Sequence, residues 1–151
     1  MGVGYPLDLV VCSALGVDMY DCVYPTRTAR FGVALIPSGT LKLKSARMDK
    51  DTRPMDDSGK CSCLACTQYT RSAINAMFKG AAEVLGCQLV TIHNIAYMLR
   101  LTRGMRQAIM EGRYANFVCE FLHGQFPDGG IPVWVCDALD AAGCDWRAEI
   151  G

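Results

Sequence analysis

Apolar residues near the start of the chain follow first a helical and then a strand-like pattern. In residues 6–15 they recur every three or four positions, with Pro6 in a first turn and Gly16 placed to end a helix. Residues 17–23 include two valines and a tyrosine and end before Pro25, which predicts a strand. A helix followed at once by an apolar strand is typical of parallel α/β proteins.

Two carboxylates lie on this predicted strand. Because successive side chains of a strand alternate between its faces, Asp18 and Asp21 are expected to point apart and form no acid/base pair. Asp21 sits near the carboxyl end, where α/β barrels place catalytic groups. Judged by its position alone, Asp21 is a solvated or turn-capping residue rather than a catalytic one.

The remaining elements are a hairpin and several helices. Residues 31–36 and 40–44 flank a Pro-Ser-Gly turn, which predicts a β-hairpin. Helices are expected at about 70–79, 89–111, 116–123 and 133–142. The expected apolar side of the longest helix consists of Ile92, Ile95, Ala96, Leu99, Met105 and Ile109.

Composition narrows the class of protein. The 151 residues suit one domain, and 51% hydrophobic with 20% charged residues argues against disorder. No run of 18 apolar residues occurs, so no membrane span is expected. The formal net charge is zero, and any nucleic-acid surface must therefore come from local clustering.

Positive charge is clustered between residues 22 and 50, where six basic residues occur with a single acidic residue, Asp49. Such a run of basic residues is usually a solvent-exposed face without a specific partner. The more specific alternative is a nucleic-acid-binding surface, in which the basic side chains neutralise phosphates. The sequence leaves both open for Arg27, Arg30, Lys42, Lys44, Arg47 and Lys50.

The chain contains three cysteines within six residues, Cys61, Cys63 and Cys66. His93 follows them much later in the sequence. Thiolate and imidazole are the donors of a tetrahedral zinc site, and three cysteines with one histidine leave no position for water. Ordinary buried cysteines are the alternative, but the clustering favours one structural Zn²⁺. The odd total of nine cysteines, without a secretory signal, favours a reducing compartment.

Four motifs in order resemble those of the tRNA-guanine transglycosylases, which are queuine tRNA-ribosyltransferases with a zinc-containing TIM barrel. They are Met1-Gly-Val-Gly4, the run from Asp18 to Arg30, Cys61-Ser-Cys-Leu-Ala-Cys66, and His93-Asn-Ile-Ala-Tyr97. Trp134-Val-Cys-Asp-Ala-Leu139 looks more like the eukaryotic catalytic subunit than the bacterial enzyme.

The resemblance implies a role for each motif. Asp21 matches the nucleophile that exchanges guanine at the tRNA wobble position for queuine through a covalent ribosyl intermediate. Cys61, Cys63, Cys66 and His93 match the zinc ligands. The RNA-contacting positions would be Gly2, Val3, Gly4, Tyr5, Pro6, Leu7, Asp8, Thr26, Arg27, Thr28, Ala29 and Arg30.

The implied fold class is α/β, the C-terminal part of a TIM (β/α)₈ barrel with a zinc-binding subdomain. Residues 1–50 would carry the last strand, its helix and the hairpin, residues 51–123 the zinc subdomain, and residues 124–151 a loop and short helix. The family barrel is more than twice this length, and its base-binding aspartates lie in the part without a counterpart here. The chain alone is therefore expected not to catalyse exchange.

The expected partners are a tRNA with a wobble guanosine, queuine or guanine, and a second copy or an accessory paralogue in a dimer. The resemblance suggests a cytoplasmic location and an association with the mitochondrial outer membrane. Two other classes of function stay open: a noncatalytic accessory subunit, and an unrelated zinc-stabilised RNA-binding module.

Overall fold

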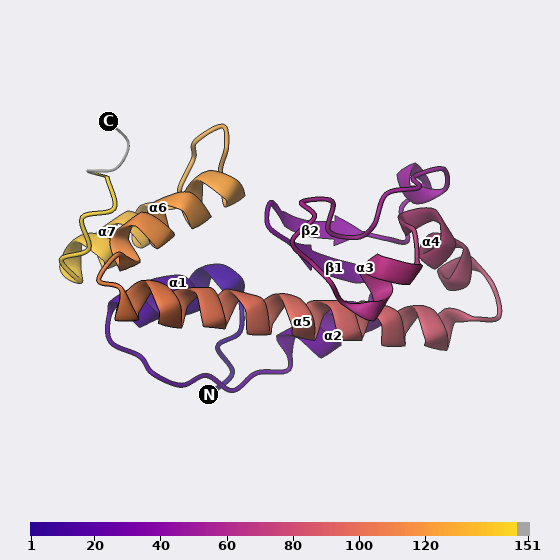
Figure 1. Ribbon diagram of the computed structural model, residues 1–151, viewed down its shortest axis with the longest axis horizontal. Coiled ribbons are helices and arrows are strands. Elements are labelled where there is room, and N and C mark those ends of the chain that lie inside the picture. The colour runs from indigo at the N-terminus through magenta and orange to yellow at the C-terminus, as the bar shows by residue number, and fades with distance from the viewer. Residues whose placement is uncertain (148–151) are drawn as a thin grey trace. The chain divides into compact units, whose positions relative to one another are not determined.

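The computed structural model describes residues 1–147, which form two compact units (Figure 1). The first unit contains Met1–Cys22 and the chain from Arg100 onward, and the second contains Val23–Leu99. The long helix α5 (Glu83–Met110) runs from the second unit into the first.

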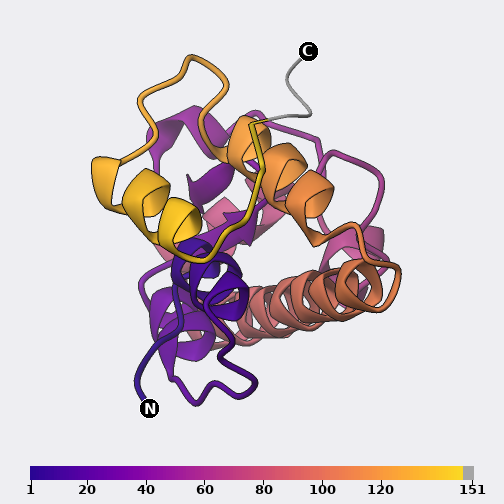
Figure 2. The ribbon, with the colours of Figure 1, turned by 90° about the vertical axis from the view of Figure 1, so that its left-hand side faces the viewer.

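The first unit is a small helical assembly. Helix α1 (Pro6–Ala14) lies against α6 (Tyr114–Gln125) and α7 (Val133–Ala141), as Figure 2 also shows. Its core is apolar, and Tyr114 anchors α6 by donating a hydrogen bond of 2.8 Å to the Val10 carbonyl. The buried residues of the three helices are Leu9, Val10, Val11, Val118, Cys119, Leu122, Val135 and Leu139. The expected helix at residues 6–15 is confirmed.

The strand predicted at residues 17–23 is absent. This segment has no regular secondary structure, and its backbone contacts include Val17 N–H to Cys12 O at 3.0 Å and Gly2 N–H to Asp21 O at 2.6 Å. An apolar segment becomes a strand only when a neighbouring strand takes its hydrogen bonds, and the described residues offer it none. Strand alternation therefore does not determine where Asp18 and Asp21 point.

The second unit is built on the predicted hairpin, which is confirmed. Strands β1 (Val33–Ile36) and β2 (Gly39–Lys42) pair antiparallel, so the described residues contain no parallel strand pair of the kind that the α/β rhythm predicted. Helix α2 (Tyr24–Arg30) precedes the hairpin, and η1 (Ala46–Met48), α3 (Leu64–Gln68) and α4 (Arg71–Lys79) follow it. The buried core is Ala29, Ala34, Leu43, Met55, Ala65, Ile74, Leu89 and Val90.

Helix α5 differs most from expectation. It begins at Glu83 rather than near Leu89. Its buried face in the second unit includes Val90, His93, Asn94 and Tyr97, which follow the helical period. Of the expected apolar side, Met105 is buried (4% exposed) and Ala96 is half-buried, whereas the other four positions are wrong, because polar residues with hydrogen-bond partners occupy the core face. Four of its members are 41–52% exposed: Ile92, Ile95, Leu99 and Ile109.

Among the described residues, α5 alone is long and apolar enough to cross a membrane by length and composition. The core helix of a globular unit passes the same test, and α5 here carries the fully buried polar residues His93 and Asn94.

A buried arginine organises the loop that leads to the cysteine cluster. Arg71, 4% exposed, donates to the carbonyls of Pro54 and Met55 at 2.8 and 3.0 Å and pairs with Asp51 at 3.1 Å. Hydrogen bonds from Arg53 and then from Arg71 hold the pKa of Asp51 well below its usual value. The loop is thus held before it reaches Cys61.

Replacing Asp51 by Asn should destabilise the protein at pH 7 by roughly 1–3 kcal/mol, since Arg71 loses a charged partner. Because the folded-state pKa of Asp51 is lowered, its contribution is complete above about pH 4 and is lost as pH falls through the folded pKa. Urea unfolding at pH 7 and pH 3 checks this. The exposed Asp49→Asn, which loses only its pairing with Lys79, should remain near wild type, and a wild-type-to-D51N gap that is unchanged at pH 3 would contradict the account.

Candidate metal centre

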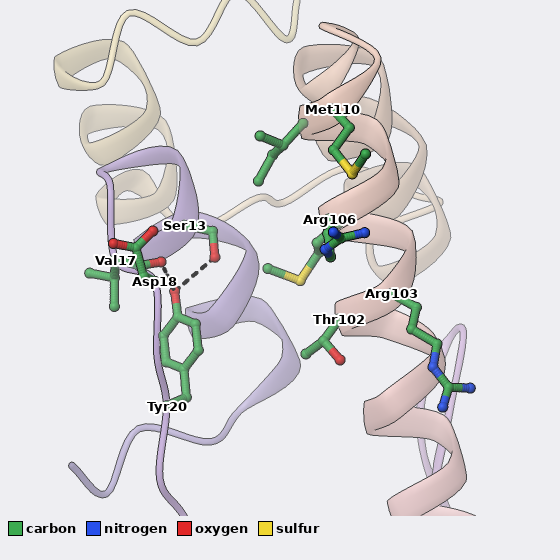
Figure 3. Close-up of a pocket in the computed structure, with 10 residues that line it drawn as sticks. Ser13, Val17, Asp18, Tyr20, Thr102, Arg103, Arg106 and Met110 are labelled. Atoms are coloured by element: carbon green, nitrogen blue, oxygen red, sulfur yellow. Dashed lines mark hydrogen bonds between the residues drawn. The ribbon is translucent and has the colours of Figure 1, made fainter.

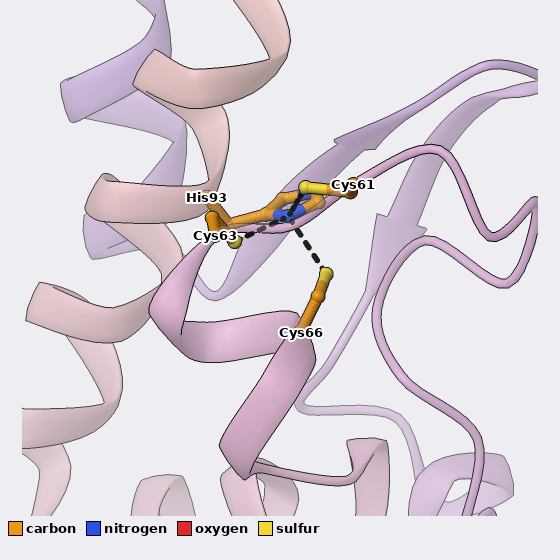
Figure 4. Close-up of side chains that lie close together, drawn as sticks. All are labelled: Cys61, Cys63, Cys66 and His93. Atoms are coloured by element: carbon orange, nitrogen blue, oxygen red, sulfur yellow. Dashed lines mark hydrogen bonds between the residues drawn. The ribbon is translucent and has the colours of Figure 1, made fainter.

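Four side chains from three segments converge on one point in the second unit (Figure 4). The Sγ atoms of Cys66, Cys63 and Cys61 lie 3.3, 3.6 and 3.7 Å from Nδ1 of His93. A tetrahedral zinc with ordinary bond lengths separates sulfur and nitrogen ligands by about 3.6 Å. The arrangement therefore fits one Zn²⁺ ion, as the sequence predicted.

The local structure explains how closely spaced cysteines reach one ion. Cys63 is the N-cap residue of α3, and Cys66 lies three residues later, close to one helical turn. Cys61 comes from the preceding loop. Helix α3 was not expected from the sequence, because five residues are too few to show a helical period.

His93 is held from its other side. Its Nε2 lies 2.8 Å from the carbonyl oxygen of Leu35, which can only accept, so Nε2 carries the proton and Nδ1 presents a lone pair to the thiols. The residue is fully buried within α5, not in the first turns of a helix as the sequence suggested. A contact of this kind orients a metal-binding imidazole.

Two of the thiols, those of Cys63 and Cys66, favour the protonated form because their pKa values are raised. Burial is the main cause that raises the pKa of Cys66 to about 12, and it also raises the pKa of Cys63, while the backbone of Asp56 opposes the shift at Cys66 through a hydrogen bond. Metal binding must therefore release protons. With three thiolates and one imidazole the tetrahedron is complete, which makes the site structural rather than catalytic.

Asp21 belongs to the first unit and is exposed. Its carbonyl accepts the 2.6 Å hydrogen bond from Gly2, which adopts a φ of 79° that suits glycine. The structure thus brings one of the predicted RNA-contacting positions, Gly2, beside the backbone of the predicted nucleophile.

A neighbouring hollow of about 460 Å³ includes Asp18 but not Asp21 (Figure 3). The Tyr20 hydroxyl lies there, 2.8 Å from Ser13 Oγ and 3.1 Å from the Leu9 carbonyl. The residues that line the hollow are Ser13, Val17, Asp18, Tyr20, Thr102, Arg103, Met105, Arg106, Ile109 and Met110. No local pattern in the sequence indicates this hollow, because the helix that forms one wall is remote along the chain.

The predicted segment from Thr26 to Arg30 lies in α2, in the second unit. Ala29 is fully buried, whereas Thr26, Arg27 and Arg30 are exposed. Within residues 1–147 neither arginine forms an ion pair, so both are available to a phosphate. The wider basic cluster is partly neutralised, since Lys44 pairs with Glu83 at 2.9 Å.

One zinc ion per chain is expected, and chelation should lower the stability of the second unit. A ligand present at a thousandfold excess over its dissociation constant stabilises by about 4 kcal/mol. Metal analysis and thermal unfolding with and without EDTA measure both effects.

Cys66→Ser and His93→Ala should abolish tight zinc binding, whereas the exposed His123→Ala should not. Full zinc retention in His93→Ala would show that the imidazole is no ligand.

The comparisons with known proteins agree on one family. A family model described as queuine tRNA-ribosyltransferase matches residues 1–127. A queuine tRNA-ribosyltransferase of Thermus thermophilus is 47% identical over 97% of this chain and 37% of its own length. Catalytic subunits of this name from Caenorhabditis briggsae and Schizosaccharomyces pombe are 44% and 41% identical over 95% and 98% of the chain, in each case 38% of the relative.

The chain therefore spans less than two fifths of the length of these relatives. The family match includes the segment around Asp21 and all four residues of the cysteine and histidine cluster. By this match and these identities, the chain belongs to the queuine tRNA-ribosyltransferase family.

Proposed function

We propose that this chain carries the nucleophile, the RNA-contacting segments and the structural zinc site of a tRNA base exchange, in which queuine replaces guanine at the wobble position. The observation that carries the proposal is the family match over residues 1–127, which contains Asp21 in its motif together with the complete ligand cluster. In the complete fold, we propose, residues 1–50 contribute to the end of a TIM barrel.

In this proposal the Asp21 carboxylate attacks C1′ of the wobble ribose, and the bond from C1′ to guanine breaks. Guanine leaves with the electron pair and takes up a proton, and the ribose remains attached to Asp21 through an ester-like bond. The incoming base then gives up its ring N–H proton and attacks C1′, the bond from C1′ to the Asp21 oxygen breaks, and the nucleoside and the free carboxylate are restored. A carboxylate nucleophile thereby divides one difficult substitution into two easier ones.

The surroundings of Asp21 are compatible with this role. Its side chain is exposed, so a ribose can approach without disrupting a buried contact. The exposed Arg27 and Arg30 would neutralise RNA phosphates. Residues 2–8 would lie along the RNA backbone, where Gly2 allows close approach. The zinc would maintain the fold of the second unit and take no part in the reaction.

Two other functions lead to different expectations. A noncatalytic accessory subunit, paired with a catalytic paralogue, would keep the zinc site without using Asp21. A zinc-stabilised RNA-binding module would bind RNA without regard to the wobble base. The presence of Asp21 within its motif, and the relatives named as catalytic subunits, favour the catalytic role.

A chimera tests the role of Asp21. Residues 1–151 replace the aligned segment of the Thermus thermophilus relative, to which they are 47% identical, and exchange is measured with radiolabelled guanine. The chimera should exchange base and form a covalent RNA adduct on a denaturing gel. Asp21→Asn should lower exchange by at least roughly a thousandfold, the scale seen when a nucleophile is lost.

The neighbouring carboxylate provides the control, since Asp18→Asn changes a residue of the adjacent hollow and should keep most of the activity. An adduct that persists in Asp21→Asn would rule out Asp21 as the nucleophile. A folded, zinc-loaded chimera without exchange would contradict the proposed function.

Binding of anticodon stem-loops separates the remaining alternatives. The zinc-loaded chimera should prefer a wobble guanosine over an adenosine, and Arg27→Ala with Arg30→Ala should weaken binding and reduce its salt dependence by about one to two phosphate contacts. Lys79→Ala, which loses an exposed pairing with Asp49, serves as the control for loss of a positive charge outside α2. Equal affinity for both stem-loops would favour a general RNA-binding module.

A further inference from the structure

Asn94 is a fully buried polar residue whose amide joins three segments of the second unit. Its Oδ1 accepts from the Leu35 backbone N–H at 2.9 Å. Its Nδ2 lies within hydrogen-bonding distance of Pro25 O at 3.0 Å, Val33 O at 3.0 Å and Thr28 Oγ1 at 3.3 Å. One side chain thus connects α5 to both the hairpin and α2.

The residue before Asn94 is the candidate metal ligand His93. Both side chains form hydrogen bonds with the backbone of Leu35 in β1. His93 donates to the Leu35 carbonyl at 2.8 Å, while Asn94 accepts from the Leu35 N–H. Leu35 is itself fully buried. A displacement of His93 would therefore move α5 relative to Leu35 and disturb the contacts of Asn94 as well.

Helix α2 depends on this contact because it has little support of its own. It is seven residues long and has no side-chain hydrogen bond at its N-cap, and so short a helix is not stable in isolation. Pro25, in its first turn, is the residue that Asn94 holds. Ala29 supplies a buried apolar contact further along.

We propose that Asn94 is a positioning residue that couples the metal centre to α2, so that occupancy of the ligand cluster orders the helix that presents Arg27 and Arg30. The consequence for RNA rests on the proposed function, whereas the coupling between metal and helix does not. Linkage requires reciprocity: if metal binding orders α2, a ligand that orders α2 must strengthen metal binding.

Asn75 offers a matched control in the same unit. It is also fully buried, and its Nδ2 donates to Leu43 O at 2.6 Å and Ser45 O at 3.0 Å. It is bonded neither to α2 nor to the four ligands. Asn75→Leu removes these two donor contacts and a buried Oδ1 that has no hydrogen-bond partner among the described residues, so it should change stability without a specific effect on α2.

Hydrogen exchange of residues 24–30 in the full chain tests the coupling without RNA. In the wild type, removing zinc with EDTA should raise amide exchange in α2 at least about tenfold, within the usual range of coupling between sites. Asn94→Leu with one bound zinc should already show the faster exchange, with little further change on chelation. Asn75→Leu should accelerate exchange around residues 43–45 and leave α2 at the wild-type rate.

Should Asn94→Leu fail to fold, Asn94→Asp keeps the acceptor for Leu35 and removes the donors to α2, and it should show the same fast exchange. Slow exchange in α2 of a zinc-loaded Asn94 variant would overturn the proposal. The proposal would also be overturned if Asn75→Leu accelerated amide exchange in α2 as much as the Asn94 variants do. The faster exchange would then reflect only a general loss of stability.

The reciprocal measurement is the rate at which zinc passes to a chromogenic chelator, with and without a wobble-guanosine stem-loop. RNA should slow zinc release from the wild type and from Asn75→Leu, but not from Asn94→Leu. A wild type that shows metal-dependent exchange in α2 but binds no RNA would support the coupling and contradict the proposed function, so the two failures are distinct.

Discussion

The imidazole of His93 has one nitrogen facing three thiols and the other bonded to the Leu35 carbonyl, and the second unit is organised around it. That unit runs only from Val23 to Leu99, a size at which an apolar core by itself gives only a few kcal/mol of stability. Apart from α5, the elements that form its core are short, and none of these would be stable alone. A metal that joins the loop, α3 and α5 supplies the constraint that such a unit requires.

Around this centre, polar side chains replace apolar packing at several key positions. Arg71 holds the loop before the cysteines, Asn75 holds the chain after the hairpin, and Asn94 holds α2. Each is buried and bonded to backbone carbonyls. Buried polar groups of this kind are costly unless satisfied, and when satisfied they favour one arrangement of irregular segments over others.

The metal centre and the proposed nucleophile belong to different compact units, which the chain joins between Cys22 and Val23 and again within α5, between Leu99 and Arg100. This division separates two tasks. A complete set of thiolate and imidazole ligands leaves zinc no position for a substrate, so its effect on chemistry can pass only through the fold. An exposed carboxylate such as Asp21 can instead meet a ribose directly.

Much of this protein was evident from local sequence signals. The spacing of Cys61, Cys63 and Cys66 identified the ligand set, since thiol chemistry needs no knowledge of the fold to be recognised. Pro6 with Gly16, and the turn at Pro37, predicted α1 and the hairpin because their signals lie within a few residues.

Only the tertiary structure decided the features that depend on distant partners. Residues 17–23 have a strand-like composition but no strand beside them among the described residues, so they remain irregular. Helix α5 buries His93 and Asn94 in place of the isoleucines, because a metal cluster and backbone groups of β1 and α2 satisfy the two polar residues. A pattern of apolar positions cannot show this, since the cost of burying a polar side chain depends on hydrogen-bond partners that only the folded chain brings within reach.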